Sequence, residues 1–291
     1  MILEPGTHSN LKSRKRFDSL FRYLCLGAAS VGVLILVIFL TKIVLDGLEY
    51  FSWKFVISDL SSRPKQTGIW PAIVGTLYVM VLTAIISVPI GVASAIYLQE
   101  FARRKNRFIS IIQLNIANLS GVPSIVYGLL GLVLFVKLLA FGQSIIAGAL
   151  TMTLLILPTV IIVTQEALKA VPTSYREGSM ALGSTQWQSI RLQVLPNALS
   201  GILTGIILSI SRAIGETAPL IVVGAATYVT SLPKGLRDHY TVLPIKIFDY
   251  ANDSKDEFHK IAASAILVLM IGLLCINSFA IYLRARTNSK K

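Results

Sequence analysis

The sequence has 291 residues, of which 54% are hydrophobic and only 14% are charged, and its mean hydropathy is +0.70. A soluble domain carries about 25% charged residues, so this composition excludes an ordinary soluble protein and indicates an integral membrane protein. The formal net charge of +13 does not indicate a nucleic-acid partner, because the Lys and Arg residues cluster beside hydrophobic segments without interleaved aromatic residues. Cys25 and Cys275 both lie in apolar stretches and fit neither a disulfide framework nor a CxxC metal site.

Six apolar runs are each long enough to cross a bilayer as a helix, which takes about 20 residues. The first run, 20–46, follows a basic tail, 1–19, and is too long for the apolar part of a cleaved secretory signal, so we expect a retained transmembrane helix. We expect helices rather than barrel strands because unpaired backbone groups are costly in lipid and no alternating pattern is present. The other expected spans lie in a membrane core, 68–283, at about 70–99, 109–137, 143–166, 197–228 and 259–283.

The distribution of Lys and Arg predicts the orientation in the membrane. If the N-terminus is cytoplasmic, the segments on that side and their margins hold 16 of the 27 basic residues, and those on the other side hold 10. Cytoplasmic loops carry an excess of Lys and Arg, so this bias predicts that both termini are cytoplasmic. The cytoplasmic segments would be 1–19, 100–108, the loop 167–196 and a second basic tail, 284–291.

Two features within the expected spans depart from a plain apolar helix. The third span carries polar residues at helical spacing, which would share roughly one stripe. Such a stripe either forms hydrogen bonds between helices or lines a water-filled face, and the spacing fits both interpretations. Prolines within spans either kink a helix or mark a pathway wall. The stripe consists of Asn118, Ser120, Ser124 and Tyr127, preceded by Asn115, and the prolines are Pro89, Pro123, Pro158 and Pro219.

The run 197–228 contains the segment SRAIGETAPL, with a full positive charge at Arg212 and a full negative charge at Glu216. On one continuous helix these i, i+4 neighbours share a face. A cation buried in the bilayer costs roughly 2.5–3.5 kcal/mol on insertion scales, so we expect the pair to face a bundle interior or a water-filled cavity. A guanidinium binds phosphate oxygens bidentately. Arg212 is therefore a candidate to contact a transported oxyanion, with Glu216 holding it between transport events and Thr217 as an additional polar group. The alternative is a salt bridge that fixes helix packing.

The segment 172–196, PTSYREGSMALGSTQWQSIRLQVLP, predicts two short capped helices between two spans. Ser174 and Glu177 have the spacing of a capping box, and Thr185 and Gln188 have the spacing of a second one. Gly183 between them suits the position that follows a helix, where a left-handed backbone is needed. A simple connection would not need two capped helices.

The apolar residues of this helix–turn–helix leave two interpretations open. Met180, Leu182 and Trp187 could form a knob that docks into a groove of another protein. They could equally anchor an amphipathic helix that rests on the lipid surface.

The same segment resembles the EAA motif of ABC-importer permeases, the loop that holds the ATPase subunit. In that motif Glu is followed by two small residues, by Gly six positions after the Glu, and by a closing Leu-Pro. Glu177, Gly183 and Leu195-Pro196 match this frame, whereas Gly178 and Ser179 replace the two alanines and Gln193 stands where isoleucine is usual. The resemblance implies that the ATPase-docking residues are Glu177, Gly178, Ser179, Ala181, Leu182, Gly183 and Trp187.

A longer resemblance, over most of 68–228, relates the sequence to the phosphate-importer permeases, with GETAPL after Arg212 most similar to the PstA-like type. This resemblance implies an all-α integral membrane protein with six transmembrane helices, a MetI-like core and a cytoplasmic coupling helix–turn–helix. It implies a non-enzymatic subunit that moves inorganic phosphate across the plasma (inner) membrane of a prokaryote. The implied partners are a homologous PstC-like permease, two PstB-like ATPase subunits and an extracytoplasmic phosphate-binding protein.

Missing motifs agree with a permease that takes its energy from elsewhere. The sequence contains no P-loop motif, so we expect ATP and Mg²⁺ on the partner ATPase and no cofactor on this chain. It also lacks HExxH and GxSxG arrangements, which disfavours a metal enzyme or an intramembrane protease. Two alternatives stay open: a permease for another oxyanion such as sulfate or molybdate, and a non-transporting membrane scaffold or phosphate-signalling partner.

Overall fold

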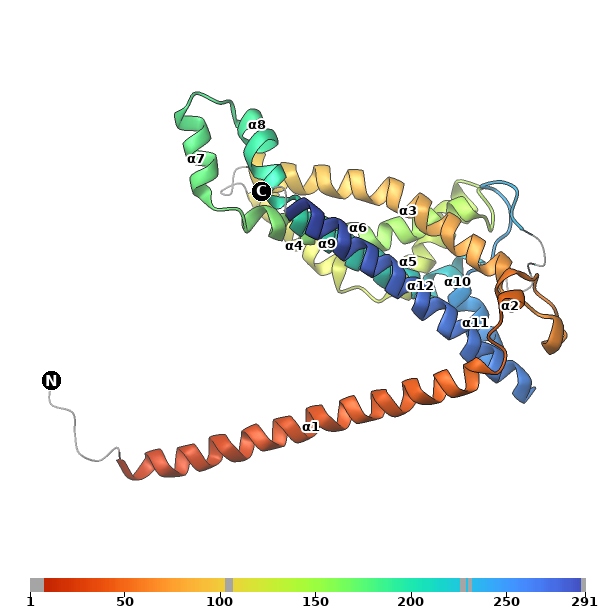
Figure 1. Ribbon diagram of the computed structural model, residues 1–291. Helices are drawn as coiled ribbons and strands as arrows, with labels where there is room; N and C mark the ends of the chain where they lie inside the picture. The colour runs from red at the N-terminus through yellow and green to blue at the C-terminus, as the bar shows by residue number, and fades with distance from the viewer. Residues whose placement is uncertain (1–7, 103–106, 226–228, 230–231, 289–291) are drawn as a thin grey trace.

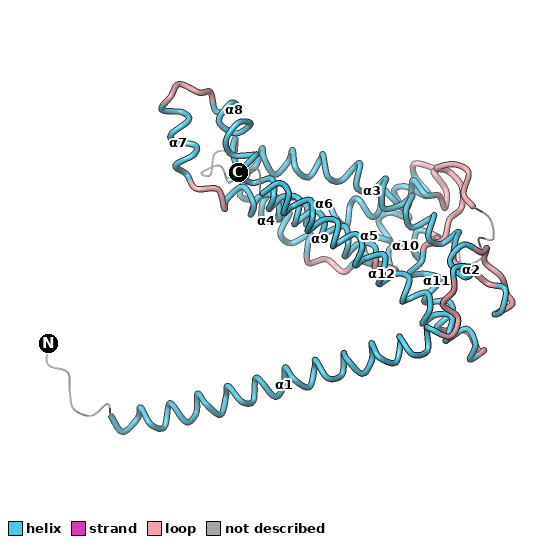
Figure 2. Tube along the Cα trace, viewed as in Figure 1, coloured by secondary structure: helices cyan, strands magenta, loops and turns pink. Residues whose placement is uncertain are grey.

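The computed structural model describes residues 8–102, 107–225, 229 and 232–288. Over these residues the chain is helical, and no strand occurs among them (Figures 1 and 2). Most of the long helices run side by side in one bundle, as expected for a membrane protein whose backbone polar groups must be paired within each helix. In chain order the helices are α1 (His8–Leu48), α2 (Trp53–Ile57), α3 (Trp70–Ile96), α4 (Arg107–Ser120), α5 (Ser124–Gly131), α6 (Ile145–Lys169), α7 (Thr173–Ala181), α8 (Gln186–Ser189), α9 (Leu195–Ile214), α10 (Ala218–Val223), α11 (Leu243–Ala251) and α12 (Asp256–Asn288).

The bundle is organised around α6, which packs against α3 on one side and α9 on the other. Small residues permit these close approaches, as is usual between helices in a membrane. A Cβ atom added to Gly91 of α3 would lie 2.6 Å from Val160 of α6, and one added to Gly205 of α9 would lie 2.7 Å from Val163. The position of α6 explains why it is the most buried of the long apolar helices.

The first helix, α1, departs from this arrangement. Its C-terminal end packs against α12, where Ser264 donates a hydrogen bond of 2.6 Å to the Gly47 carbonyl and Lys260 pairs with Glu49 at 2.7 Å. The rest of α1 points away from the bundle (Figure 1), and most of its apolar side chains from Phe17 onwards are exposed. Lipid or another membrane subunit is needed to cover such a surface.

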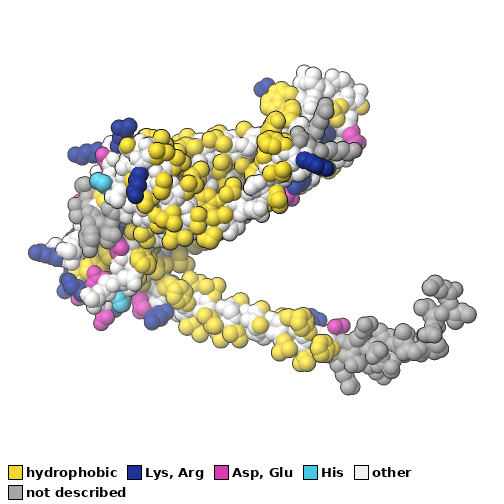
Figure 3. Space-filling model, turned by 180° about the vertical axis from the view of Figure 1, so that it is seen from behind, with side chains coloured by type: hydrophobic (Ala, Val, Ile, Leu, Met, Phe, Trp, Pro, Cys, Tyr) yellow, Lys and Arg dark blue, Asp and Glu magenta, His cyan; other side chains and the backbone are white. Residues whose placement is uncertain are grey.

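Charged and apolar side chains are separated along the bundle (Figure 3). Lys, Arg, Asp and Glu gather at its two ends, and apolar side chains cover the middle and the described part of α1. Within the described residues, five helices are long and apolar enough to cross a membrane, and the pair α4–α5 gives a sixth if it is counted as one broken span. This is the all-α membrane fold that the sequence predicts.

The third expected span, 109–137, is not one helix. It breaks between Ser120 and Ser124, where α4 and α5 meet at a bend of 103°. Pro123 causes the break in part, because it lacks an N–H and disfavours helical backbone at the preceding residue. The predicted single stripe of polar residues along this span is therefore wrong. After α5 the chain continues as a π-helical turn, Leu132–Leu138.

The expected span 197–228 is also interrupted. The helix α9 ends at Ile214, and the separate short helix α10 starts at Ala218. Gly215 and Pro219 flank the interruption, and both residue types favour an end or a new start of a helix. Glu216 and Thr217 thus lie in a turn and not on the helix that carries Arg212, contrary to the prediction. Residues 226–228, the end of the expected span, lie outside the described residues.

A helix–turn–helix, α7 and α8, projects from one end of the bundle (Figure 1). The predicted turn is present, with Gly183 at φ +86°. The capping box of Thr185 and Gln188 is also present. The box predicted at Ser174 is wrong, because Pro172 occupies the N-cap of α7 and no side chain caps that helix. Contrary to the prediction, the second short helix is not separate from the following span but continues through a π-helical turn, Ile190–Val194, into α9.

Candidate functional site

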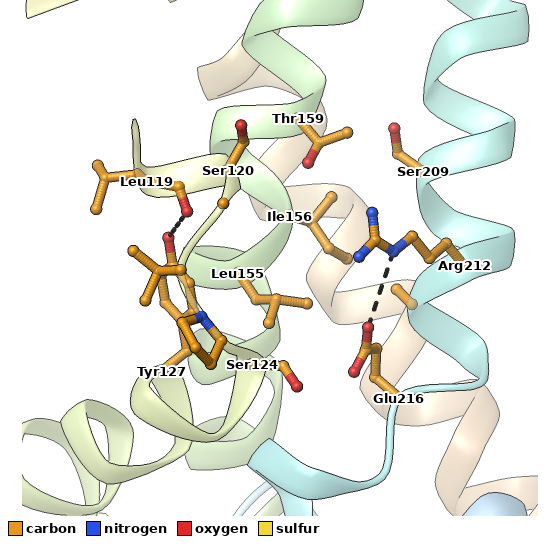
Figure 4. A pocket seen from close by; sticks show the side chains of 14 residues that line it. Leu119, Ser120, Ser124, Tyr127, Leu155, Ile156, Thr159, Ser209, Arg212 and Glu216 are labelled. Atoms are coloured by element: carbon orange, nitrogen blue, oxygen red, sulfur yellow. Dashed lines mark hydrogen bonds and ion pairs between the residues drawn. The ribbon is translucent and has the colours of Figure 1, made fainter. Parts of the chain in front are cut away.

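A cavity of about 360 Å³ lies where the α4–α5 break faces the middle of α6 and the end of α9 (Figure 4). The bend in the third span and the interruption after α9 both contribute to it, because each turns the backbone away from the regular helical path. Its polar lining comes from segments far apart in the sequence. These residues are Ser120, Ser124, Tyr127, Thr159, Ser209, Arg212 and Glu216.

Arg212 supplies the positive charge of the cavity. It lies in the last turn of α9, and Glu216 approaches it from the following turn (Figure 4). The Arg212 Nε atom is 3.9 Å from the Glu216 Oε1 atom, which exceeds hydrogen-bond distance, so charge attraction alone holds this pair. The Arg212 side chain is 76% exposed in the isolated chain. The guanidinium is therefore accessible to a ligand in the cavity.

Four hydroxyl groups line the same cavity. Ser120 and Ser124 come from the two sides of the α4–α5 break, Thr159 comes from α6, and Ser209 lies one turn before Arg212 on α9. Two of these hydroxyls donate to backbone carbonyls of their own helices, Ser120 to Ala117 at 2.7 Å and Ser209 to Gly205 at 2.8 Å. A hydroxyl can rotate to donate to a ligand instead. The cavity thus combines one guanidinium with several neutral donors.

Tyr127 has a different role from the other predicted residues. Its hydroxyl donates a hydrogen bond of 2.8 Å to the Leu119 carbonyl, across the α4–α5 break (Figure 4). The same carbonyl, at the end of α4, also accepts from the Val122 N–H at 3.1 Å, so two donors from beyond the helix end hold it. Close packing holds α5 in place as well, since a Cβ atom on Gly128 would lie 2.8 Å from Pro219 of α10. Tyr127 therefore stabilises the bend that shapes the cavity.

The structure places two predicted pathway residues outside the cavity lining. Asn118 is exposed near the end of α4, and Thr217 occupies the N-cap of α10 with its hydroxyl 3.5 Å from the Gly215 carbonyl. Conversely, sequence reasoning missed Thr159 and Ser209. Ser209 lies three residues before Arg212, so the helical spacing could have indicated it. Thr159 belongs to another helix and carries no comparable signal.

The predicted docking residues lie at the far end of the molecule, on α7, α8 and the turn between them (Figure 1). Leu182 is 90% exposed. Trp187 is half-exposed, and its ring centroid lies 6.3 Å from that of Phe101 at the end of α3. Ser179 is half-buried and hydrogen-bonded to Ser189. The remaining predicted docking residues are exposed: Glu177, Gly178, Ala181 and Gly183.

Comparison with known proteins relates the chain to curated membrane permeases. It is 33% identical over 215 residues to the probable ABC transporter permease protein YqgI of Bacillus subtilis strain 168, covering 74% of this chain and 73% of that protein. It is 32% identical over 276 residues to the phosphate transport system permease protein PstA 2 of Mycobacterium bovis, covering 94% and 90%. It is 30% identical over 275 residues to the phosphate transport system permease protein PstA of Haemophilus influenzae, covering 94% and 96%.

A solved structure and a family model agree with these relatives. The inward-facing MetNI methionine ABC transporter is similar in fold, with a TM-score of 0.58 at 18% identity over 76% of this chain and 94% of that chain. The family model of the binding-protein-dependent transport system inner membrane component matches residues 87–288. The chain therefore belongs to the inner membrane components of binding-protein-dependent transport systems, the non-catalytic, multi-pass permease subunits of ABC transporters with a MetI-like core.

Proposed function

We propose that this chain is the PstA-like permease subunit of an ABC importer that moves inorganic phosphate into the cytoplasm. The observation that carries the proposal is the Arg212 guanidinium, which lines a cavity together with four hydroxyl groups beside the α4–α5 break. A tetrahedral oxyanion needs several donors, and a guanidinium matches two of its oxygens at once. The relatives named phosphate transport system permease support phosphate as the oxyanion.

Some residues of the cavity bind the anion, and another assists its release. Arg212 binds two oxygens of the anion, and the hydroxyls of Ser124, Thr159 and Ser209 donate to the others. A bare cation would hold the anion too long, because transport needs sites that are weak enough to leave. Glu216 competes with the anion for Arg212 and so assists release. The exposed side of Arg212 fits a second, PstC-like permease that closes the cavity.

The two ends of the bundle take different partners in this proposal. The α7–α8 end is cytoplasmic and docks an ATPase, and two PstB-like ATPase subunits with their ATP and Mg²⁺ drive transport, with no cofactor on this chain. A phosphate-binding protein delivers phosphate at the opposite, extracytoplasmic end. The excess of Lys and Arg on the α7–α8 side supports this orientation, with both chain termini cytoplasmic in the plasma (inner) membrane of a prokaryote.

The test is ATP-dependent uptake of labelled phosphate by proteoliposomes that contain the whole complex. Arg212→Gln is expected to lower uptake about 100-fold, because two hydrogen bonds to a charged group are lost. Arg212→Lys keeps the charge but not the bidentate geometry, so we expect an intermediate rate. Arg22→Gln, at an exposed position on α1 away from both the cavity and the α7–α8 end, is the control. Normal uptake by Arg212→Gln in an assembled complex would contradict the anion role.

The donor set of the cavity also fits other tetrahedral oxyanions, so the same assay includes competitors. Excess unlabelled sulfate or molybdate is expected to leave phosphate uptake unchanged. Stronger competition by sulfate than by unlabelled phosphate would assign the sulfate-type permease instead. ATP hydrolysis without any movement of phosphate would favour the non-transporting signalling partner.

A further inference from the structure

Two charged residues that lie far apart in the sequence meet at the α7–α8 end of the bundle. Glu100 belongs to the π-helical turn Tyr97–Phe101 that ends α3, and Arg176 belongs to α7. The Arg176 Nε atom donates to Glu100 Oε2 at 3.0 Å, and Arg176 Nη2 donates to Glu100 Oε1 at 2.6 Å. The Arg176 side chain is only 19% exposed and the Glu100 side chain only 7% exposed. This is a bidentate, largely buried ion pair.

The same guanidinium also contacts α6. Arg176 Nη2 donates to the Leu168 carbonyl at 2.9 Å, and Nη1 donates to the Val171 carbonyl at 2.9 Å. The last carbonyls of a helix have no partner within that helix and carry its negative dipole end, so a cation stabilises them. The segment 172–196, which contains α7 and α8, is called the docking loop below. One of its side chains, Arg176, therefore binds the ends of both α3 and α6.

The second helix of the loop is attached to the same turn of α3. Gln186 Nε2 donates to the Glu100 carbonyl at 2.5 Å, and the Trp187 ring lies against Phe101. Both α7 and α8 are thus tied to residues 100–101. A loop that only connected α6 to α9 would not need contacts with α3.

Helix stability does not account for the location of Glu100. A carboxylate near the C-terminal end of a helix is unfavourable to the helix dipole, and burial of any charge carries a desolvation cost. Apolar side chains could fill the same space at no such cost. Arg176 is directed inward to this pair, whereas its neighbour Glu177 is exposed for a partner. The adjacent residues Arg176 and Glu177 of α7 thus face different surroundings: Arg176 faces α3 and α6 within this chain, and Glu177 faces the outside.

We propose that Glu100 and Arg176 are positioning residues that fasten the docking loop to α3 and α6, so that movement of the loop moves these two helices together. The inference rests on the proposed function, in which an ATPase docks on α7 and α8. The pair touches neither the ATPase nor phosphate. The Glu100–Arg176 pair determines how far α3 and α6 move when the ATPase moves the docking loop, and so how much phosphate is transported per ATP hydrolysed.

The experiment measures phosphate uptake and ATP hydrolysis in the same proteoliposomes of the whole complex, for Glu100→Gln, Arg176→Gln and Arg176→Lys. The control is Glu166→Gln, which removes an exposed ion pair with Lys169 at the end of the same α6. Loss of one partner of a buried ion pair is expected to lower phosphate moved per ATP by about tenfold or more, with ATP hydrolysis retained. Arg176→Lys, which keeps the charge and fewer contacts, should fall between wild type and Arg176→Gln.

The ratio of uptake to hydrolysis separates positioning from a merely structural role, because loss of folded complex lowers both rates equally and leaves the ratio unchanged. A wild-type ratio in Glu100→Gln and Arg176→Gln would overturn the proposal. If Glu100→Gln or Arg176→Gln does not assemble into the complex, Arg176→Lys is tested in its place. A wild-type ratio of phosphate uptake to ATP hydrolysis in Arg176→Lys would also overturn the proposal. Wild-type complex without ATP-dependent phosphate uptake would contradict the proposed function instead.

Discussion

Arg212 and Glu216 face each other across 3.9 Å although they belong to different local structures. Arg212 is fixed to the last turn of α9, whereas Glu216 lies in the turn between α9 and α10. An accessible ion pair of this kind is worth about 1 kcal/mol or less. The pair can therefore open without unwinding a helix, and a ligand with two oxygens can replace the carboxylate.

Removal of the competing carboxylate tests this exchange. Glu216→Gln keeps the shape of the side chain and leaves Arg212 without its anionic neighbour, so bound phosphate should leave more slowly. We expect both the half-saturating phosphate concentration and the maximal uptake rate to fall by about fivefold, the equivalent of 1 kcal/mol. Uptake kinetics in proteoliposomes measure both quantities. Glu257→Gln, at an exposed position in the first turn of α12, should leave them unchanged, and a higher half-saturating concentration in Glu216→Gln would contradict the competition.

The two hydroxyls that sequence reasoning missed provide a second prediction. Thr159→Val and Ser209→Ala each remove one donor from the cavity, and a hydrogen bond to a charged group is worth about 1.5–3 kcal/mol. Each should raise the half-saturating phosphate concentration by about tenfold. Thr153→Val is the control, because this buried threonine of α6 donates within its own helix to Ala149 and does not line the cavity. An equal rise of the half-saturating phosphate concentration in all three variants would show that altered packing, and not loss of a hydrogen bond to phosphate, causes the rise.

Hydropathy was sufficient to predict the long helices but not their interruptions. Pro89 and Pro158 lie inside α3 and α6, which continue through them, whereas Pro123 marks a bend of 103°. The residue type is the same in all three cases. The difference comes from tertiary contacts, such as the Tyr127 hydrogen bond to Leu119 that stabilises the bend, and a contact across a bend has no sequence periodicity.

In the candidate site, too, some features could be predicted from the sequence and others could not. Arg212 and Glu216 could be predicted because a charge within an apolar run is conspicuous. Their separation onto different elements was not predicted, because the apolar run continues through Gly215 and Pro219 and hydropathy does not distinguish the end of a helix from a kink within it. The Glu100–Arg176 pair carries no sequence signal either, since its residues come from different helices.

The docking loop contains two glycines, Gly178 and Gly183, that both have room for a Cβ atom but differ in backbone conformation. A Cβ atom at either Gly178 or Gly183 meets no heavy atom within 4 Å, but Gly183 has φ +86°. Gly183→Ala should destabilise the turn by about 1–2 kcal/mol, the cost of a left-handed backbone for an L-residue. Gly178→Ala should stabilise α7 by about 0.5–1 kcal/mol. Amide hydrogen exchange of α7 is expected to accelerate in the first variant and slow in the second; the opposite order would contradict the turn geometry.

A buried ion pair at the opposite end predicts a dependence on pH. Lys246 and Asp249 of α11 lie 3.4 Å apart. Burial lowers the pKa of Lys246 and raises the pKa of Asp249, and each partner opposes the shift of the other. Lys246→Met leaves the carboxylate without this partner and should cost about 3 kcal/mol, whereas the double variant Lys246→Met with Asp249→Asn should recover most of the loss.

The sign of the pH effect follows from the raised pKa of Asp249. In Lys246→Met only burial remains, so folding takes up a proton and stability falls as the pH rises through the folded-state pKa. The melting temperature of this variant should therefore be higher at about pH 5 than at about pH 8. The double variant lacks the carboxyl group and should lose this difference. A variant Lys246→Met that melts at the same temperature across the range would contradict burial of the carboxylate.

The continuous helix from Gln186 to Ile214 has 29 residues and carries the docking loop at one end and Arg212 at the other. At 1.5 Å per residue, Gln186 and Arg212 are about 39 Å apart along its axis. A tilt of about 5° about either end then sweeps the other through about 3 Å. In the proposed transport cycle, a rotation of this size at the ATPase-docking end would displace Arg212 by a distance comparable to its 3.9 Å separation from Glu216, enough to exchange the carboxylate for a phosphate oxygen.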